Sequence, residues 1–470
     1  MNMKKLLPLL IALAILTGCR TSTVPPITLS APPVSQLPTA TPLPTPIVED
    51  PEIIAERELI ERVNRAVSIF QAHVGDEFPT EEFLFWLESI VYPPIMSELA
   101  EMPESQSLSS FLRERTGESL HVLKMRFDGL MDDPGGAAAA LGIYFAPENG
   151  GDITLAFGGD VNLIEGSYVM PYFRLAQSDL SNVLTDGLLE EMRSADVLLL
   201  NNEFSYSNRG YPIPAKTYTF RAPPENVGIF ADMGVDVAYL ANNHVFDYGS
   251  DALLDTLQTL DEAGIPRIGA GMDIAEASRP VFYIAGGRKI AYIGAGCIER
   301  YSVFTPGAGE ATPGIFRVDE NNADLLLSII ESCAEESDLV IVNLHWGIES
   351  TSVLEEYQRQ LGQMCIDAGA DAVIGAHPHV LQGAEFYNGT PIIYSTGNFW
   401  FSTTQNYTCL IELLLDAENN MRVKFLPCTT GGGITRLAHG DTAAQIIEYY
   451  RGISFGVDIN EDGYITDARS

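Results

Sequence analysis

The sequence predicts an α/β domain with a largely parallel or mixed sheet, preceded by a helical region and an extended N-terminal segment. From residue 152 onward, short apolar runs alternate with helical stretches, which is typical of α/β domains. Before residue 148, apolar residues recur at three- and four-residue steps, as on helices. Residues 20–50 are rich in Pro, Thr and Ser, a composition that builds no core. The predicted parts are therefore a lipoprotein signal peptide (1–19), a Pro/Thr-rich linker (20–50), a helical region (51–148), the α/β domain (149–450) and a polar C-terminal tail (451–470).

The first nineteen residues have the order of a bacterial secretion signal. Lys4 and Lys5 precede an apolar run that ends in Leu16, Thr17, Gly18 and Cys19. The run is short for a membrane span, and small residues before a cysteine resemble the bacterial lipobox. The resemblance implies cleavage before Cys19, lipid on its thiol, and an extracytoplasmic protein anchored to the bacterial cell membrane. An uncleaved anchor, or an ordinary signal with a chance cysteine, is the alternative.

Charge and cysteine usage limit the possible partners. The formal net charge of the 470 residues is −36, so long-range repulsion disfavours nucleic acid and bare anionic membrane. A polyanionic substrate would need metal ions or a local basic pocket. Five cysteines remain beyond Cys19, without CxxC spacing, and this odd number in apolar segments indicates packed thiols.

In the α/β domain, the expected strands are apolar runs and the expected helices lie between them. The runs cover 153–157, 196–200, 235–241, 289–295, 338–344, 371–375 and 391–395. The expected helices cover 181–193, 225–233, 251–264, 321–336 and 354–368. A hairpin is expected around Glu418, Asn419 and Asn420, and GGG at 431–433 is expected to border the site.

Polar residues follow six of these runs at the point where each strand is expected to end. In an open α/β sheet, ligands bind outside the carboxyl ends of the strands. Taken singly, an Asp could be a helix cap, an Asn a turn residue and a His a hydrogen-bonded core residue. Together they predict an active site. The residues are Asp160, Glu203, Asn242, Asn243, His244, His345, His377, His379 and Asn398, which include four of the seven histidines.

The residue types predict one or two divalent metal ions. Imidazole, carboxylate and amide oxygen together suit Mn, Fe or Zn better than Ca²⁺. A carboxylate between two ions, with histidines outside, would form a two-metal centre suited to displacement at phosphorus. His377 and His379 flank Pro378, so the pair could reach two adjacent ions.

These motifs resemble the CapA-type poly-γ-glutamate capsule synthesis proteins. The matching pieces are GGDVN, NNEF, LANNHVFDYG, HWGIE, GAHPHVLQG and YSTGNFWF, in family order over residues 152–402. The family is similar to the calcineurin-like metallophosphatases. This implies a four-layer α/β/β/α domain here, with two facing sheets covered by helices.

The resemblance also implies roles for single residues. Asp160 would be the first metal ligand and Glu203 the bridging carboxylate. Asn243, His345, His377 and His379 would complete the metal sites. His244 would be the acid or orienting residue, with Asp247 behind it, while Asn162, Glu349 and Asn398 would surround the ligands. Metallophosphatases usually have histidine where Asn162 stands and aspartate where Glu203 stands, so one metal position is expected to be weak or absent.

The function expected is that of a surface lipoprotein of poly-γ-glutamate capsule biosynthesis or export, with a metal-dependent phosphoesterase-like site. Its partners would be the membrane, through lipid on Cys19, poly-γ-glutamate and capsule synthase subunits. The alternative is a non-catalytic component that binds a polyanion or assembles the synthase through the same site. A solute-binding lipoprotein is a third possibility, but no internal repeat supports it. Residues 458–467, DINEDGYITD, have part of the spacing of a calcium loop but favour a polar turn.

Overall fold

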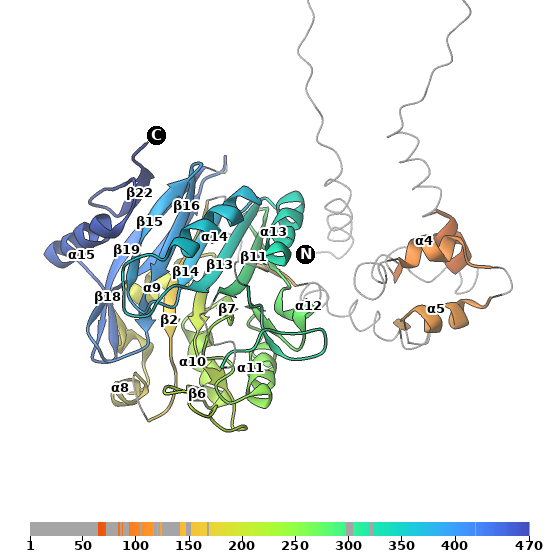
Figure 1. Ribbon diagram of the computed structural model, residues 1–470, viewed down its shortest axis with the longest axis horizontal. Coiled ribbons are helices and arrows are strands. Elements are labelled where there is room, and N and C mark those ends of the chain that lie inside the picture. The colour runs from red at the N-terminus through yellow and green to blue at the C-terminus, as the bar shows by residue number, and fades with distance from the viewer. Residues whose placement is uncertain are drawn as a thin grey trace, which may run out of the picture. The chain divides into compact units, whose positions relative to one another are not determined.

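The computed structural model of the chain (Figure 1) forms two compact units, residues 1–141 and 142–470. It describes residues 64–71, parts of 83–124, and 142–146, 152–166, 169–297, 304–318, 323–418 and 420–469. The predicted signal peptide, Cys19 and the linker 20–50 lie outside the described residues.

The described part of the first unit is helical and has its own core. Residues 64–71 are helical, followed by α4 (Ile95–Ala100) and α5 (Leu108–Thr116). Phe70, Leu99 and Phe111 are buried together in one apolar cluster. No helix among the described residues has the length and apolarity needed to cross a membrane.

The second unit contains a seven-stranded sheet, most of whose pairs are parallel. Parallel pairing runs from β11 through β13 and β14 to β16, whereas β10 and β15 pair antiparallel with their neighbours β11 and β16. The strand order is β1 (Ile143–Phe145), β10 (Val281–Ala285), β11 (Arg288–Cys297), β13 (Leu339–Trp346), β14 (Ala372–Ala376), β16 (Thr390–Thr396) and β15 (Leu381–Tyr387).

The second large sheet has eleven strands and is mixed. Its parallel part comprises β2, β4, β7 and β8, and its antiparallel part begins where β18 pairs with β2. The main order is β21 (Val457–Ile459), β22 (Tyr464–Asp467), β19 (Met421–Gly431), β18 (Asn406–Leu415), β2 (Ile153–Val161), β4 (Val197–Asn202), β7 (Val237–Tyr239) and β8 (Arg267–Ile268), with β17 (Asn398–Trp400), β20 (Ile434–Leu437) and β3 (Leu184–Thr185) at the side.

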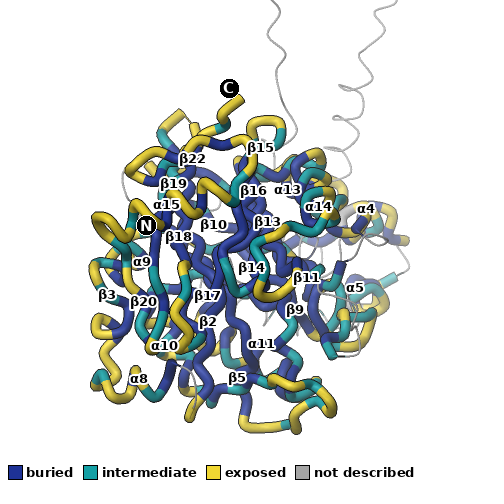
Figure 2. Tube along the Cα trace, turned by 60° about the vertical axis from the view of Figure 1, so that its left-hand side comes forward, coloured by how far each residue is buried: buried dark blue, intermediate teal, exposed yellow. Residues whose placement is uncertain are grey.

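The predicted four-layer α/β/β/α arrangement is confirmed by how the two sheets bury their faces. The side chains of β13 alternate between two apolar clusters. Val340 and Val342 pack in the same cluster as Leu326 and Cys365 of the covering helices. Ile341, from the other face of β13, belongs to the larger cluster between the sheets and beneath the remaining helices. Figure 1 shows α13 and α14 across the seven-stranded sheet, and Figure 2 shows the strands buried inside an exposed outer layer. The helices are α8 (Met170–Leu175), α9 (Leu188–Ser194), α10 (Val227–Asp232), α11 (Ser250–Glu262), α12 (Ile274–Ala277), α13 (Asp324–Glu336), α14 (Glu356–Asp367) and α15 (Gly440–Ile453).

An aspartate stands just before each of four parallel strands and binds the neighbouring strand. Each carboxylate accepts a hydrogen bond of 2.8 Å from a backbone N–H of that neighbour. The aspartate's own N–H donates to the carbonyl of the same neighbouring residue. This doubled contact fixes the register at the amino ends of the strands. The pairs are Asp196 with Thr154, Asp236 with Leu198, Asp338 with Lys289 and Asp371 with Val340.

Both ends of the α/β unit extend beyond the expected limits. Strand β1 pairs in parallel with β10, so the unit begins at residue 142 rather than 149. The segment expected as a polar tail is folded, because β21 and β22 form a hairpin on β19 and bury Val457, Ile459 and Ile465 in the main core. Asn460 Oδ1 accepts the N–H groups of Asp462 and Tyr464, which makes the calcium-like stretch a hairpin turn.

Candidate metal centre

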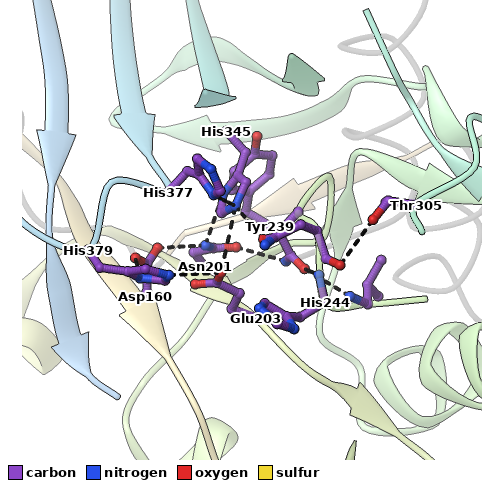
Figure 3. Close-up of polar contacts among 12 residues, drawn as sticks. Asp160, Asn201, Glu203, Tyr239, His244, Thr305, His345, His377 and His379 are labelled. Carbon is purple, nitrogen blue, oxygen red and sulfur yellow. Dashed lines mark hydrogen bonds and ion pairs between the residues drawn. The ribbon is translucent and has the colours of Figure 1, made fainter. Parts of the chain in front are cut away.

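Strand ends from both sheets meet at one site, which Figure 3 shows with its polar contacts. Asp160 is the second-last residue of β2, and Glu203 directly follows β4. Asn243 and His244 follow β7, and His345 lies near the end of β13. The turn after β14 carries His377 and His379, and Asn398 begins β17, which pairs with β2 at Asp160. The residues predicted from six separate strand ends are thus brought together across the space between the sheets.

Glu203 lies in the middle of this site without a hydrogen bond. Its side chain is fully buried, and neither carboxylate oxygen has a hydrogen-bond partner. Its Oε1 atom lies 3.7 Å from His345 Nε2 and 3.8 Å from His379 Nε2. An unsatisfied buried carboxylate costs several kcal/mol unless something else binds it. Glu203 therefore has the environment of a metal ligand.

The first group of possible ligands, called the His345 group, comprises Glu203, His345 and His377, with Asn243 beside them. His345 Nε2 lies 3.0 Å from His377 Nδ1 and 3.0 Å from Asn243 Oδ1. On its other side, His345 Nδ1 lies 3.3 Å from Asn201 Nδ2. This contact orients the ring so that Nε2 is directed at the group.

The second group, called the His379 group, comprises Asp160, Glu203 and His379. His379 Nδ1 lies 2.9 Å from both Asp160 Oδ2 and Asn398 Oδ1. The other Asp160 oxygen accepts 2.7 Å from Asn201 Nδ2. Glu203 is common to both groups, so its carboxylate stands where a bridge between two cations would stand.

The backbone at the two histidines is unusual. His377 has φ +102° and His379 has φ +60°, in the left-handed region that L residues seldom adopt. The carbonyl of Pro378 between them accepts 2.8 Å from the N–H of Ser350, which also has positive φ. Such strain persists where the surroundings fix it, and it is concentrated at functional sites. Here it directs one imidazole to each ligand group.

The surroundings set the charge of these side chains. Burial lowers the pKa of His345 and His377 well below the ordinary value, and the nearby imidazoles add to this effect. Both rings are therefore neutral at neutral pH, as metal ligands must be. Burial is the largest single influence on His379 and disfavours its protonated form. The hydrogen bonds to Asp160 and Asn398, together with the charges of Asp160 and Glu349, outweigh burial and raise the pKa of His379. Burial raises the pKa of Glu203 well above its ordinary value, and Asp160 and Glu349 raise it further.

His244 and Asp247 form a buried pair beside the metal ligands. His244 Nδ1 lies 2.7 Å from Asp247 Oδ2. Because a carboxylate accepts, the imidazole proton is on Nδ1 and Nε2 remains available. Asp247 Oδ2 also accepts 2.6 Å from the N–H of Phe220, whose ring centroid is 4.1 Å from that of His244. The other oxygen, Oδ1, accepts from Lys216 Nζ. Burial lowers the pKa of His244, although Asp247 favours its protonated form.

The remaining predicted residues lie at different depths. Asn162 is buried, and its Oδ1 accepts 3.1 Å from the N–H of Ile164 while its Nδ2 has no partner. An amide nitrogen is not a metal ligand, so the atom of Asn162 that lacks a partner does not bind a cation. Asn398 contacts His379 directly. Glu349 is exposed and acts on Glu203 and His379 through its charge.

Sequence reasoning missed two residues of the site. Asn201 contacts Asp160 and His345, and its Oδ1 accepts 2.9 Å from Asn242 Nδ2. It is the first polar residue after the apolar run 196–200, which was a usable signal. Lys216 lies far from any expected strand end, so no strand-end pattern includes it.

The residues present fit divalent transition metals. The two groups together offer imidazole nitrogens, carboxylate oxygens and an amide oxygen, and within each group the ligand atoms of the histidines and carboxylates lie within 4.8 Å of one another. This donor set suits Zn, Fe or Mn. The unsatisfied oxygens of Glu203 are the independent observation that supports a cation.

Comparison with known proteins identifies the family. The family model described as "Bacterial capsule synthesis protein PGA_cap" matches residues 154–403, which is more than half of the chain. The chain belongs to the PGA_cap family. The matched PGA_cap region includes every residue of both ligand groups, from Asp160 to His379, and also Asn398.

Curated relatives of this PGA_cap chain come from several bacteria. It is 32% identical over 247 residues to the "PGA biosynthesis protein CapA" of Bacillus subtilis, covering 50% of this chain and 62% of that one. It is 34% identical over 199 residues to the "Capsule biosynthesis protein CapA" of Bacillus anthracis, covering 41% and 46%. A "Probable polyglutamine synthesis accessory protein" of Mycobacterium tuberculosis is 30% identical over 213 residues, covering 44% and 56%. The chain thus spans about half to three fifths of the length of these relatives.

Among solved structures, the crystal structure of the protein TT1561 of Thermus thermophilus aligns with a TM-score of 0.33 and 12% identity. The alignment covers 58% of the PGA_cap chain and 98% of that protein.

Proposed function

We propose that this chain is an extracytoplasmic lipoprotein of poly-γ-glutamate capsule biosynthesis or export with a metal-dependent phosphoesterase site. The capsule role is supported by membership of the PGA_cap family and by the names of the relatives. The chemistry is supported by one observation above all. The buried Glu203 carboxylate, without a hydrogen bond, is shared by two groups of possible ligands.

The chain's own residues would divide the work as follows. His345, His377 and Glu203, with Asn243, would hold one ion, while Asp160, His379 and Glu203 would hold the other. Two such ions, when bound, supply the positive charge that stabilises displacement at phosphorus. Asp247 holds one proton of His244 on Nδ1 and favours the doubly protonated ring. With a second proton on Nε2, the imidazolium would donate that proton to the leaving-group oxygen and return to the neutral ring. Asn201 keeps Asp160 and the His345 ring in place.

Metal content and turnover of the full-length chain test this proposal. The wild-type chain is expected to hold one or two Mn, Fe or Zn ions by elemental analysis and to hydrolyse p-nitrophenyl phosphate or its diester. His377→Ala is expected to lose metal and turnover. The matched control is His439→Ala, because His439 is exposed and its Nε2 lies 3.1 Å from the Asp186 carbonyl, outside both ligand groups. Unchanged metal content in His377→Ala would contradict the metal centre.

A second outcome separates catalysis from binding. If the wild-type chain holds metal, hydrolyses no phosphoester and binds poly-γ-glutamate, the site serves a non-catalytic component that binds polymer or assembles the synthase. If binding to the polymer also depends on His377, that alternative is favoured directly.

The lipid anchor needs its own test, since Cys19 lies outside the described residues. Cells supplied with radiolabelled palmitate are expected to label the wild-type chain and to leave Cys19→Ala unlabelled. The variant is also expected to leave the membrane fraction. A labelled Cys19→Ala chain would contradict attachment at this cysteine.

A further inference from the structure

A segment between β5 (Ser205–Tyr206) and β6 (Arg221–Ala222) brings a lysine into the candidate metal centre. The sequence from 204 to 224 contains three cationic residues and no carboxylate, in a chain of net charge −36. One of the three, Lys216, has a side chain that is only 11% exposed. A lysine is seldom buried to this extent without a specific partner.

The segment is fixed to Asp247 at three points. The N–H of Ile213 donates 2.9 Å to the Asp247 carbonyl, and the N–H of Phe220 donates 2.6 Å to its carboxylate. Lys216 Nζ donates to the other carboxylate oxygen. Asp247 therefore holds His244 on one side and this segment on the other.

The turn that directs Lys216 inward is itself strained. The N–H of Lys216 lies 3.3 Å from the Ile213 carbonyl, which closes a turn over Pro214 and Ala215. Ala215 has φ +67°, at the position of a type II turn where glycine is preferred. A turn of this kind is stable only when its surroundings favour it, and here the inward lysine forms part of those surroundings.

The ammonium group of Lys216 has a donor left for a ligand. An ammonium has three N–H donors, and two of them bind Asp247 Oδ1 and the Asn243 carbonyl. Thr305 Oγ1 also donates to that carbonyl, at 3.0 Å, so Asn243 stays fixed even without the lysine. The cation thus contacts the carbonyl of Asn243, a possible metal ligand, and shares the Asp247 carboxylate with His244.

We propose that Lys216 is a substrate-binding residue of this site that receives an oxyanion, either a phosphoryl oxygen or a carboxylate. The proposal rests on the proposed function and adds the class of substrate to it. That substrate is anionic, although the protein itself is strongly acidic. The lysine supplies the local positive charge that such a substrate needs, in addition to any metal ion.

The test compares anion affinity in the metal-loaded full-length chain. Lys216→Met is expected to keep the wild-type metal content and to weaken competitive inhibition by inorganic phosphate about tenfold to a hundredfold, the factor for one hydrogen bond to a charged group. Its KM for p-nitrophenyl phosphate rises by a similar factor, while kcat changes less. Lys216→Arg regains most of the affinity, because it restores the charge. The matched control is Lys289→Met, since Lys289 is 13% exposed and pairs with Glu336; it leaves phosphate inhibition unchanged.

A second ligand distinguishes the two sources of the oxyanion. Calorimetry with tri-γ-glutamate measures carboxylate binding. If Lys216→Met loses affinity for phosphate alone, Lys216 binds a phosphoryl oxygen. If it loses affinity for both ligands equally, Lys216 binds either kind of oxyanion. If the wild-type chain hydrolyses no phosphoester, the proposed function fails, but calorimetry still tests Lys216. If Lys216→Met does not fold, Lys216→Gln replaces it, because its amide still donates to the Asn243 carbonyl. A metal-loaded Met or Gln variant with unchanged affinity for both anions overturns the proposal.

Discussion

The Nδ1 atom of His377 lies 3.0 Å from the Nε2 atom of His345, and both rings are buried. The same Nε2 atom is 3.0 Å from Asn243 Oδ1. Nε2 of a neutral imidazole carries at most one proton, and that proton can point at only one of these two neighbours. The lone pairs of several side chains instead face a common volume, as they do around a cation.

Glu203→Gln tests whether both ligand groups depend on one carboxylate. The substitution keeps the shape but removes the charge, so we expect the chain to lose metal from both groups. In the presence of chelator it should be as stable as the wild type or more stable, by about 1–3 kcal/mol, because an unpartnered buried acid has been replaced by an uncharged group. Elemental analysis and urea unfolding measure the two effects. Full metal content in the variant would show that Glu203 is not shared.

His377→Gln tests the electrostatic environment of the His345 group. The pKa of His377 is lowered on folding, so the unfolded chain binds more protons below the ordinary histidine pKa of about 6.5. The chelator-treated wild type should therefore lose stability as the pH falls from about 7 to 5. The variant lacks this contribution and should lose less. Urea unfolding at several pH values checks the slope, and identical slopes would contradict the neutral buried imidazole.

Asp236→Asn tests the aspartates at the amino ends of the strands. Burial raises the pKa of Asp236 to about 6, so the folded chain binds more protons than the unfolded chain between the ordinary Asp value of about 3.9 and this pKa. The contribution of Asp236 to stability should thus fall as the pH rises through that window. Asn keeps an oxygen for the N–H of Leu198 and cannot ionise, so it should stabilise the chain at pH 8 relative to wild type. A less stable variant at pH 8 would show that the charged hydrogen bond outweighs burial.

Gly159→Ala tests the contact that places Asp160. A Cβ at residue 159 would come within 1.7 Å of the Gly397 carbonyl, which accepts 3.1 Å from the N–H of Asp160. We expect a loss of about 3 kcal/mol or more in unfolding free energy, together with a loss of metal. Gly228→Ala in α10 is the control, since nothing lies within 4 Å of its added Cβ. Equal stability of the two variants would contradict the close approach.

Much of the fold follows from the sequence because buried parallel strands leave continuous apolar runs. Residues 338–344 and 371–375 became β13 and β14 nearly as expected, and both faces of these strands are covered. The hairpin of β21 and β22 escaped notice because its strands are short and its turn is polar. Only its pairing with β19 makes it part of the core.

The candidate site, like the fold, could be predicted from the sequence only in part. Residues at strand ends, such as Asp160 and His345, could be predicted because topology alone brings strand ends to one edge. Lys216 could not, because its position depends on a turn at Ala215 and on Asp247, which is distant in sequence. The sequence feature that marks Lys216 is its place in a stretch without carboxylates. This feature indicates a role only when the structure places the segment beside the site.

The four aspartates that begin parallel strands lie at the opposite edge of the sheets from the histidines. Each of the four strands is thereby aligned at its amino end, independently of the residues at its carboxyl end. Substitutions among the residues at the carboxyl ends therefore leave the contacts that align these strands unchanged. The contacts that align these strands and the residues that could bind cations lie at opposite ends of the same sheets.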